Sequence, residues 1–178
     1  MVNKSGLTQR FVGAPTVLIA IGANLPYAGQ AARETCRDVV AALRNVPGLD
    51  IEAVSSWYES APVPPSGQPP YINGMVRART WIEPMALLEA LQAIETQFGR
   101  ERSIPNAART LDLDIITFGN LCQTDSQLTL PHPRADERAF VLLPLQDVAP
   151  QWVHPVSGRT LAELLPDVAG QEIRRIQE

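Results

Sequence analysis

Residues 109–119 read RTLDLDIITFG, an apolar run that carries Asp112 and Asp114 and closes at a glycine. The run predicts a strand from Leu111 to Phe118, bounded by a Gly-Asn turn. Side chains alternate between the faces of a strand. Leu111, Leu113 and Ile115 therefore share one face and point to a core. The two aspartates share the other face, about 7 Å apart along the strand.

Outward from this strand, the hydrophobic periodicity alternates between strand and helix. The order is β-α-β-β-α-β, which predicts an α+β fold of ferredoxin-like topology, an antiparallel sheet with helices packed on it. The predicted strands before residue 109 are Thr16–Leu25, Ile51–Ser60 and Tyr71–Thr80, and the predicted helices are Ala31–Leu43 and Pro84–Phe98.

The last third of the chain predicts a C-terminal extension of this fold. It holds a strand-like LTLPH at 128–132, a helix near Ala135–Val148 and a short helix near Thr160–Leu165. We interpret residues 1–14 as a loose tail and residues 15–178 as a single domain. There is no signal-peptide pattern and no apolar run of the roughly 18 residues that a membrane span needs. These features predict a cytoplasmic protein.

Composition excludes several kinds of chemistry. The net charge is −4, which does not favour general nucleic-acid binding. Lys4 is the only lysine, so mechanisms that need a core lysine are excluded, and phosphates would be held by arginine and metal. Cys36 and Cys122 match no metal or redox spacing and are predicted to be reduced thiols. His132 and His154 are too few for a histidine zinc site.

The aspartate pair has three interpretations. Two carboxylates this close raise each other's pKa unless a cation lies between them. Both could face water on a solvated sheet edge, or each could pair with an arginine. Two carboxylates with phosphate oxygens also suit Mg²⁺, and the arginine-rich surroundings favour this interpretation. The arginines that bracket the pair are Arg100, Arg102, Arg109, Arg134 and Arg138.

Tyr71 and Asn73 lie on one face of their predicted strand, directly after the proline-rich stretch APVPPSGQPP at 61–70. A ring and an amide in this arrangement could bind a flat heterocycle, and core packing is an equal alternative. His132 could contact phosphate or ribose. We expect the three tryptophans to be packing residues and His154 to lie on the surface.

Taken in order, these motifs resemble the 6-hydroxymethyl-7,8-dihydropterin pyrophosphokinase family of folate biosynthesis. The resemblance covers residues 16–165. Its motifs are IAIGANL at 19–25, APV at 61–63, YIN at 71–73, IETQFGRER at 94–102, ARTLDLDIITFGN at 108–120, LTLPHPRADERAFVLLPL at 128–145 and DVAP at 147–150.

The resemblance implies a reaction and a site. The enzyme would transfer the β,γ-pyrophosphoryl group of ATP to the hydroxymethyl oxygen of the pterin and release AMP, with two Mg²⁺ ions on Asp112 and Asp114. Tyr71 and Phe140 would sandwich the pterin. The resemblance further implies that Asn73, Ser60 and Val63 contact the pterin edge, that Arg100, Arg102, Arg109 and Arg138 bind phosphates, and that Gln92, Ile115, Thr129 and His132 surround the nucleotide.

The sequence departs from the family pattern at one loop. Residues 103–108 read SIPNAA and lack the arginine and tryptophan that the family often carries there. Gln127 and Pro133 stand where some members have arginine and tyrosine.

Two other classes of function are alternatives for a chain with this element order. An RNA-binding ferredoxin-like module predicts exposed strand aromatics and a basic face, and the sequence shows neither. A sugar-nucleotide transferase using Asp-x-Asp would need a larger nucleotide domain. The preferred interpretation is an enzyme that acts on small molecules, without nucleic-acid or membrane partners, and as a monomer.

Overall fold

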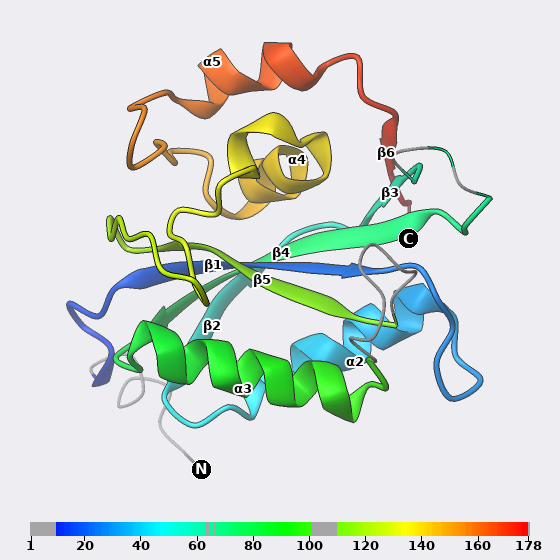
Figure 1. The fold of residues 1–178 in the computed structure, drawn as a ribbon, viewed down its shortest axis with the longest axis horizontal. Coiled ribbons are helices and arrows are strands. Elements are labelled where there is room, and N and C mark those ends of the chain that lie inside the picture. The colour runs from blue at the N-terminus through cyan, green and yellow to red at the C-terminus, as the bar shows by residue number, and fades with distance from the viewer. Residues whose placement is uncertain (1–9, 63–64, 66, 101–109, 178) are drawn as a thin grey trace.

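The computed structural model describes residues 10–62, 65, 67–100 and 110–177, and it is an α+β structure built on one antiparallel sheet (Figure 1). The predicted antiparallel sheet with packed helices is thereby confirmed. The elements are β1 (Thr16–Ala23), α2 (Ala32–Arg44), β2 (Leu49–Val54), β3 (Tyr58–Ser60), β4 (Tyr71–Thr80), α3 (Pro84–Gln97), β5 (Asp112–Phe118), the 3-10 helix η1 (Ala135–Glu137), α4 (Ala139–Val148), α5 (Leu161–Leu164), the 3-10 helix η2 (Leu165–Val168) and β6 (Ile173–Arg175).

The sheet follows the order β5-β1-β4-β3-β6, and β2 also pairs with β4. Every pairing between these strands is antiparallel. The long strands β1 and β4 lie at the centre of this order, between the two hydrophobic cores. β5 lies at one end of the order, so one of its main-chain edges is not covered by another strand of the sheet.

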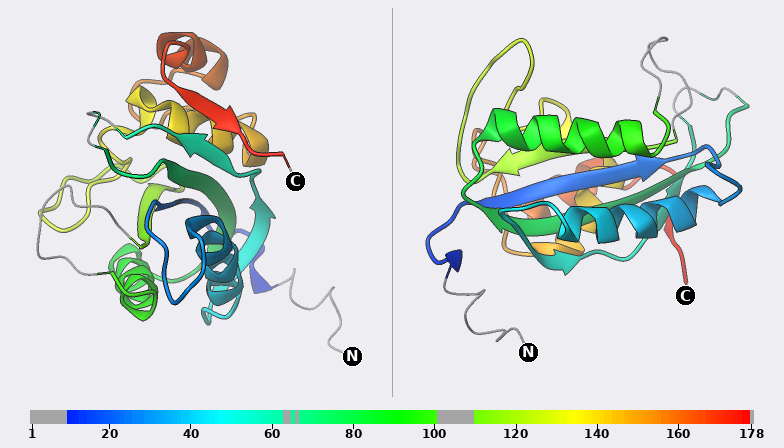
Figure 2. Two further views of the ribbon diagram at one scale, coloured as in Figure 1. Left: turned by 90° about the vertical axis from the view of Figure 1, so that its right-hand side faces the viewer. Right: turned by 90° about the horizontal axis from the view of Figure 1, so that it is seen from below.

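Helices cover both faces of the sheet (Figures 1 and 2). α2 and α3 pack on one face, where Val39, Leu43 and Leu91 meet Ile19 and Leu113 in one hydrophobic core. α4 and α5 pack on the other face, in a second core that includes Leu18, Met75 and Ile116. Each fully buried leucine or isoleucine contributes about 1.5–3 kcal/mol of hydrophobic stabilisation.

The prediction of one continuous strand over Ile51–Ser60 was wrong, because the strand is interrupted between β2 and β3. Ser55 bonds to Met75 twice, its N–H donating to the main-chain oxygen (2.9 Å) and its Oγ accepting from the N–H (2.8 Å). Asp147 of α4 then accepts from Ser56 N (3.1 Å) and from Tyr58 Oη (2.9 Å). The serines satisfy the main chain at the break, and β3 continues to pair with β4.

In the C-terminal part of the chain, two predictions were wrong and one strand was missed. LTLPH forms no strand, and only an isolated bridge joins Leu130 to Gln123. The predicted helix over Ala135–Val148 divides at Arg138, whose extended backbone (φ −123°, ψ 120°) separates η1 from α4. β6 was not predicted because it is short and mostly exposed. It pairs with β3, and Arg174 there binds Glu59 (3.1 Å).

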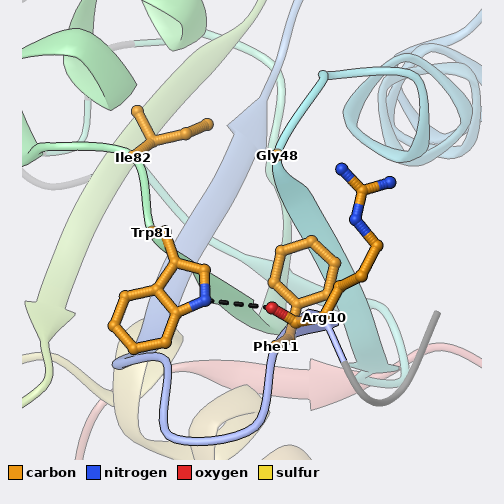
Figure 3. A pocket seen from close by; sticks show the side chains of 5 residues that line it. All are labelled: Arg10, Phe11, Gly48, Trp81 and Ile82. Carbon is orange, nitrogen blue, oxygen red and sulfur yellow. Dashed lines mark hydrogen bonds between the residues drawn. The ribbon is translucent and has the colours of Figure 1, made fainter. Parts of the chain in front are cut away.

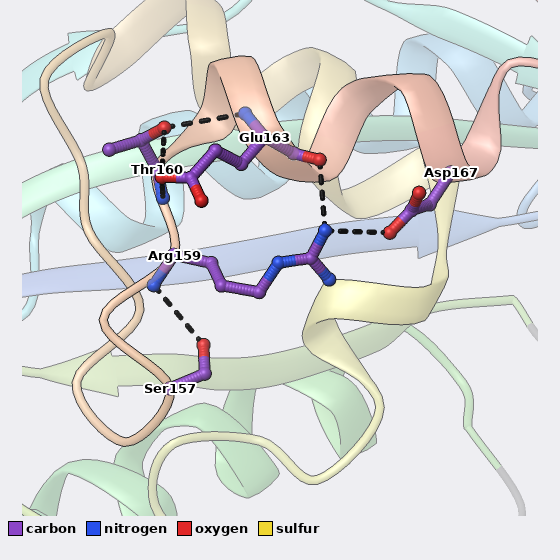
Figure 4. A network of polar contacts seen from close by, with 5 residues as sticks. All are labelled: Ser157, Arg159, Thr160, Glu163 and Asp167. Atoms are coloured by element: carbon purple, nitrogen blue, oxygen red, sulfur yellow. Dashed lines mark hydrogen bonds and ion pairs between the residues drawn. The ribbon is translucent and has the colours of Figure 1, made fainter.

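A polar network fixes the last helices (Figure 4). Thr160 caps α5 by accepting from Glu163 N, and the Glu163 carboxylate accepts from Thr160 N, both at 3.3 Å. Arg159 Nη2 donates to the Glu163 main-chain oxygen (3.0 Å) and to Asp167 Oδ2 (2.8 Å). The network ties the start of α5 to η2, which follows it.

Two aromatic predictions were wrong. His154 is buried rather than on the surface, and its Nδ1 accepts from Val156 N (3.2 Å) and Ser157 N (3.1 Å). Trp81, predicted to be packed, is 59% exposed. Both cysteines are free thiols, as predicted, and burial raises the pKa of Cys36 to about 12.

Candidate functional site

Asp112 and Asp114 lie on the face of β5 that does not enter the α2–α3 core, as their spacing predicted. Their partners across the strand pair are small: Gly22 of β1 lies opposite Asp112, and Ala20 lies opposite Asp114. Gly22 also pairs with Asn73 of β4, so Asp112, Gly22 and Asn73 form one row across the sheet. The Asn73 side chain lies over Gly22, where an added Cβ would be 3.4 Å from its Oδ1, so an amide and two carboxylates share this face of the sheet.

Arg100 binds Asp112 and also pairs with the buried carboxylate of Glu95. Its Nη1 donates to Asp112 Oδ1 (2.6 Å) and also contacts Glu95 Oε2. Glu95 is 2% exposed, and Oε2 also accepts from Leu113 N (3.0 Å), the amide between the two aspartates. Burial opposes the charge of Arg100, but the carboxylates of Asp112 and Glu95 prevail and raise its pKa. This guanidinium therefore stays charged beside the acidic pair.

Sequence reasoning missed Glu95. A signal was present, because Leu87, Leu91, Ile94 and Glu95 form the buried stripe of α3. An acidic residue on an apolar helix face is buried only with a partner. The partners are Arg100 at the end of α3 and the main chain of β5. α3 and β5 are therefore connected through one carboxylate.

Arg138, at the break before α4, and His132 both interact electrostatically with the aspartates. Arg138 Cζ lies 5.3 Å from the centre of the Phe140 ring, a cation–π contact. Burial and Arg134 lower the pKa of Arg138, against the opposing effect of Asp114 and Asp112. Burial and Arg138 lower the pKa of His132, again with Asp112 opposing. Arg138 is thus within electrostatic reach of both carboxylates, and His132 is within reach of Asp112.

The predicted heterocycle-binding residues start β4. Asn73 is buried, and its Nδ2 donates to Ser60 Oγ (2.8 Å) and to the main-chain oxygen of Tyr71 (3.4 Å). Ser60 pairs with Tyr71 across β3 and β4. Tyr71 and Asn73 share the face of β4 that also carries the row to Asp112. Phe140 lies in the first turn of α4, which packs on that face.

For three residues predicted to surround the nucleotide, the contacts that the structure shows are with other parts of the fold and not with the aspartates. Ile115 points into the opposite core with α2 and α3. Thr129 Oγ1 donates to the Asp125 main-chain oxygen (3.3 Å). Gln92 lies on α3, where its main-chain oxygen accepts from Thr96 Oγ1 (3.1 Å). His132 is tied to the β5 edge, because its N–H donates to the Ile116 oxygen (2.8 Å).

Val63, Arg102 and Arg109 lie outside the described residues, as does the 103–108 loop. Among the residues that are described, no three His, Cys, Asp or Glu side chains gather as a metal cluster. Asp112 and Asp114 are the residues of this site that could hold a metal ion. A pair of carboxylates suits Mg²⁺, which keeps waters and binds substrate phosphates.

A separate hollow of about 440 Å³ lies at the other end of β4 (Figure 3). Trp81 and Ile82 line it with Phe11, and Trp81 Nε1 donates to the Arg10 main-chain oxygen (3.0 Å). It holds no carboxylate and lies away from the row of Asp112, Gly22 and Asn73.

Comparisons with known proteins agree with the geometry. The family profile described as 7,8-dihydro-6-hydroxymethylpterin-pyrophosphokinase (HPPK) matches residues 18–150. A 2-amino-4-hydroxy-6-hydroxymethyldihydropteridine pyrophosphokinase of Synechocystis is 44% identical over 135 residues, which are 76% of this chain and 69% of that protein. The protein of the same name from Pseudomonas aeruginosa is 40% identical over 160 residues, 90% of this chain and 96% of its own length.

Solved structures share the fold. The wild-type HPPK-DHPS of Plasmodium falciparum has a TM-score of 0.65 at 14% identity, and the match covers 86% of this chain and 44% of that one. The chain therefore spans less than half of that longer protein. Within the residues that were searched, no helix is long and apolar enough to cross a membrane.

Proposed function

The chain belongs to the 7,8-dihydro-6-hydroxymethylpterin-pyrophosphokinase family, and we propose that the residues around Asp112 and Asp114 carry out the family reaction. The enzyme is an ATP-dependent transferase of folate biosynthesis that moves a pyrophosphoryl group from ATP to hydroxymethyldihydropterin. Removal of pyrophosphoryl from ATP leaves AMP. The observation that carries the assignment to this site is the aspartate pair on one face of β5, beside Arg100.

Asp112 and Asp114 would hold two Mg²⁺ ions. Their carboxylates share one face of β5, and the Arg100 guanidinium pairs with Asp112. Bound Mg²⁺ would neutralise phosphate charge and align the reacting oxygens. The protein's own part is to fix the two carboxylates through the β1–β5 pairing and the bond from Leu113 N to Glu95.

Arginines would hold the triphosphate. Arg100 and Arg138 both lie near the aspartates, and Arg102 and Arg109 are proposed to join them from the segment outside the described residues. A guanidinium binds phosphate oxygens in pairs. These residues would orient the chain of phosphates in line with the hydroxyl of the pterin. Positioning and charge stabilisation account for most of the rate enhancement in phosphoryl chemistry.

The pterin would lie between Tyr71 and Phe140. Asn73 and Ser60 form a bonded pair at the start of β4, and with Val63 they would contact the edge of the heterocycle. Arg138 already occupies one side of the Phe140 ring, so the pterin would use the other. The arrangement would place the hydroxymethyl group toward the row that leads through Gly22 to Asp112.

The nucleotide would lie along the open edge of β5. Ile115 is buried, so its contribution would come from main-chain groups. His132 is anchored to that edge at Ile116, and Thr129 and Gln92 would complete this side.

We also propose the ferredoxin-like topology for this fold, with the second strand divided into β2 and β3. The strand order around β1 and β4 supports it. We further propose that residues 15–178 form a single domain and that residues 1–14 are a loose tail. The protein is proposed to be a monomer and to be located in the cytoplasm.

Product analysis tests the function. The protein is incubated with ATP, Mg²⁺ and 6-hydroxymethyl-7,8-dihydropterin, and the nucleotides are separated. AMP that forms only with the pterin present is the expected result. ADP as the product, or AMP that forms equally without the pterin, would contradict the proposal.

A further inference from the structure

The loop after β1 presents one tyrosine on a tight turn. Tyr27 N donates to the Gln30 oxygen (3.0 Å), and Gln30 N donates back to the Tyr27 oxygen (2.9 Å). The two residues between them, Ala28 and Gly29, have φ of 52° and 80°. Two positive φ values between mutually bonded residues are typical of a type I′ turn. The turn fixes the direction in which Tyr27 leaves the loop.

Tyr27 reaches the end of α3. Its Oη donates to the Gln97 main-chain oxygen (3.2 Å), and its ring centre lies 6.2 Å from that of Phe98, at 58°. A Cβ added to Gly99 would lie 2.4 Å from Tyr27 Cε2. Tyr27 therefore contacts three consecutive residues, and the next residue in the chain is Arg100.

Gly99 forms the turn that directs Arg100. Its φ is 82°, its N–H donates to the Thr96 oxygen (3.0 Å), and Arg100 N donates to the Glu95 oxygen (3.0 Å). These two bonds form a Schellman motif, which ends a helix by reversing the chain at a left-handed glycine. The reversal returns the Arg100 guanidinium to Glu95 of the same helix and to Asp112. The orientation of Arg100 depends on this turn, and the Tyr27 ring covers it.

We propose that Tyr27 is a positioning residue for Arg100, acting through Gly99. The same loop begins at Asn24, whose Nδ2 donates to Gln68 Oε1 (3.3 Å) and to the Pro69 oxygen (3.2 Å) of the proline-rich loop. The 24–30 loop thus connects the pterin side of the site to the arginine on the phosphate side. The inference rests on the proposed phosphate-binding role of Arg100.

The first test compares Tyr27→Ala and Tyr27→Phe with wild type. Tyr27→Ala removes the ring from Gly99 and is expected to lower kcat about 10-fold or more, with KM for the pterin changed less than about twofold. Tyr27→Phe keeps the ring and is expected to retain most of kcat. Trp81→Ala is the matched control, because Trp81 also donates to a main-chain carbonyl but lies at the far hollow (Figure 3).

The second test is a double-mutant cycle with Arg100→Ala. If Tyr27 acts through Arg100, the tyrosine substitution is expected to cost little in the Arg100→Ala background. Full additivity of the two losses would overturn the inference, and so would an equal loss of kcat in Trp81→Ala. An unchanged kcat in folded Tyr27→Ala would overturn it too.

Failure of the proposed function can be distinguished from failure of the positioning role, because in the first case the wild type makes no AMP. In that case the same cycle is measured on Mg²⁺–ATP affinity by calorimetry. Weaker binding in both single variants without additivity supports the positioning role. Unchanged binding in Tyr27→Ala overturns it.

Discussion

The charge of Asp112 is balanced by a residue that its own strand does not supply. Arg100 comes from the end of α3, and Glu95 of the same helix holds that guanidinium and Leu113 N. At the scale of residues, the guanidinium of Arg100 therefore joins two carboxylates, the buried one of Glu95 and the partly exposed one of Asp112.

Asp112→Asn and Asp114→Asn remove the proposed metal ligands. Each is expected to lower turnover by about 10³-fold or more, because phosphate charge is then left without its metal. AMP formation measures this, and circular dichroism checks that the fold survives. Asp38→Asn, at an exposed position of α2, is the matched control. Retention of most activity in both site variants would rule out the two-metal assignment.

Glu95→Ala is expected to reduce the free energy of unfolding by about 3–5 kcal/mol, because it leaves Arg100 without its buried partner. Glu95→Gln keeps hydrogen-bonding capacity and should cost about 1–3 kcal/mol. Denaturant unfolding measures both. Glu89→Ala on the exposed side of α3 should change little. A Glu95→Ala protein as stable as wild type would show that this carboxylate does not hold the site together.

His132 makes stability depend on pH. Its pKa is lowered by burial and Arg138, and its Nδ1 accepts from Arg134 N (3.2 Å) as the unprotonated form. Between this lowered pKa and the ordinary 6.5, the unfolded state binds more protons than the folded state. Stability is therefore fully present above about pH 6.5 and falls as the pH drops through the folded pKa.

The metal-free wild type is expected to lose more stability between about pH 7 and pH 5 than His132→Asn does. Thermal unfolding across that range measures the difference. Parallel curves for the two proteins would show that His132 does not contribute to this dependence.

At the scale of elements, the strongly periodic segments were predictable and the interruptions were not. β1, β4, α2 and α3 end within a few residues of their predicted bounds, because local periodicity and turn residues determine them. The break at residues 55–57 depends on bonds to Met75 and to Asp147, which is 91 residues from Ser56 along the chain. No local pattern carries such information.

The site shows the same division. Strand alternation placed Asp112 and Asp114 on one face, and the structure confirms it. Glu95 and Tyr27 were missed because each acts on a segment distant in sequence, Glu95 on β5 and Tyr27 on Gln97, 70 residues away. The roles of the predicted substrate residues stay predictions.

The turn that carries Tyr27 gives a prediction about backbone conformation. Ala28 has φ of 52°, where an L-residue with a Cβ is strained by about 1 kcal/mol. Ala28→Asn should therefore raise the free energy of unfolding by about 0.5–1 kcal/mol. Gly29→Ala, at φ 80° with no neighbouring atom within 4 Å, should lower it through strain alone. Shifts of the same sign in both variants, seen in urea unfolding, would contradict this.

At the scale of the whole molecule, the site residues come from one end of the sheet. The end of β1, the starts of β4 and β5, and the last turn of α3 meet there, while the Trp81 hollow lies at the other end (Figures 1 and 3). A ligand at the first end would connect the two sheet faces, because α3 packs on one and α4 on the other.

Ligand binding should therefore stabilise the entire fold. Mg²⁺–ATP at about 100 times its Kd is expected to add about 2.7 kcal/mol, a rise in Tm of about 5–10 °C. ATP with EDTA should give a much smaller shift, and Asp114→Asn should lose most of the shift. An equal rise with EDTA present would show that nucleotide binds here without metal.

The Trp57 ring fills the space that a side chain at position 74 would occupy. A Cβ added to Gly74 would lie 2.4 Å from Cζ3 of the Trp57 ring, which is buried beside β4. Gly74 can therefore gain a side chain only where position 57 carries a smaller residue than tryptophan. A homologue that gains a side chain at position 74 is expected to carry a smaller residue at position 57. A mutational library that varies both codons together is expected to recover folded proteins with a side chain at position 74 that a library of position 74 alone does not.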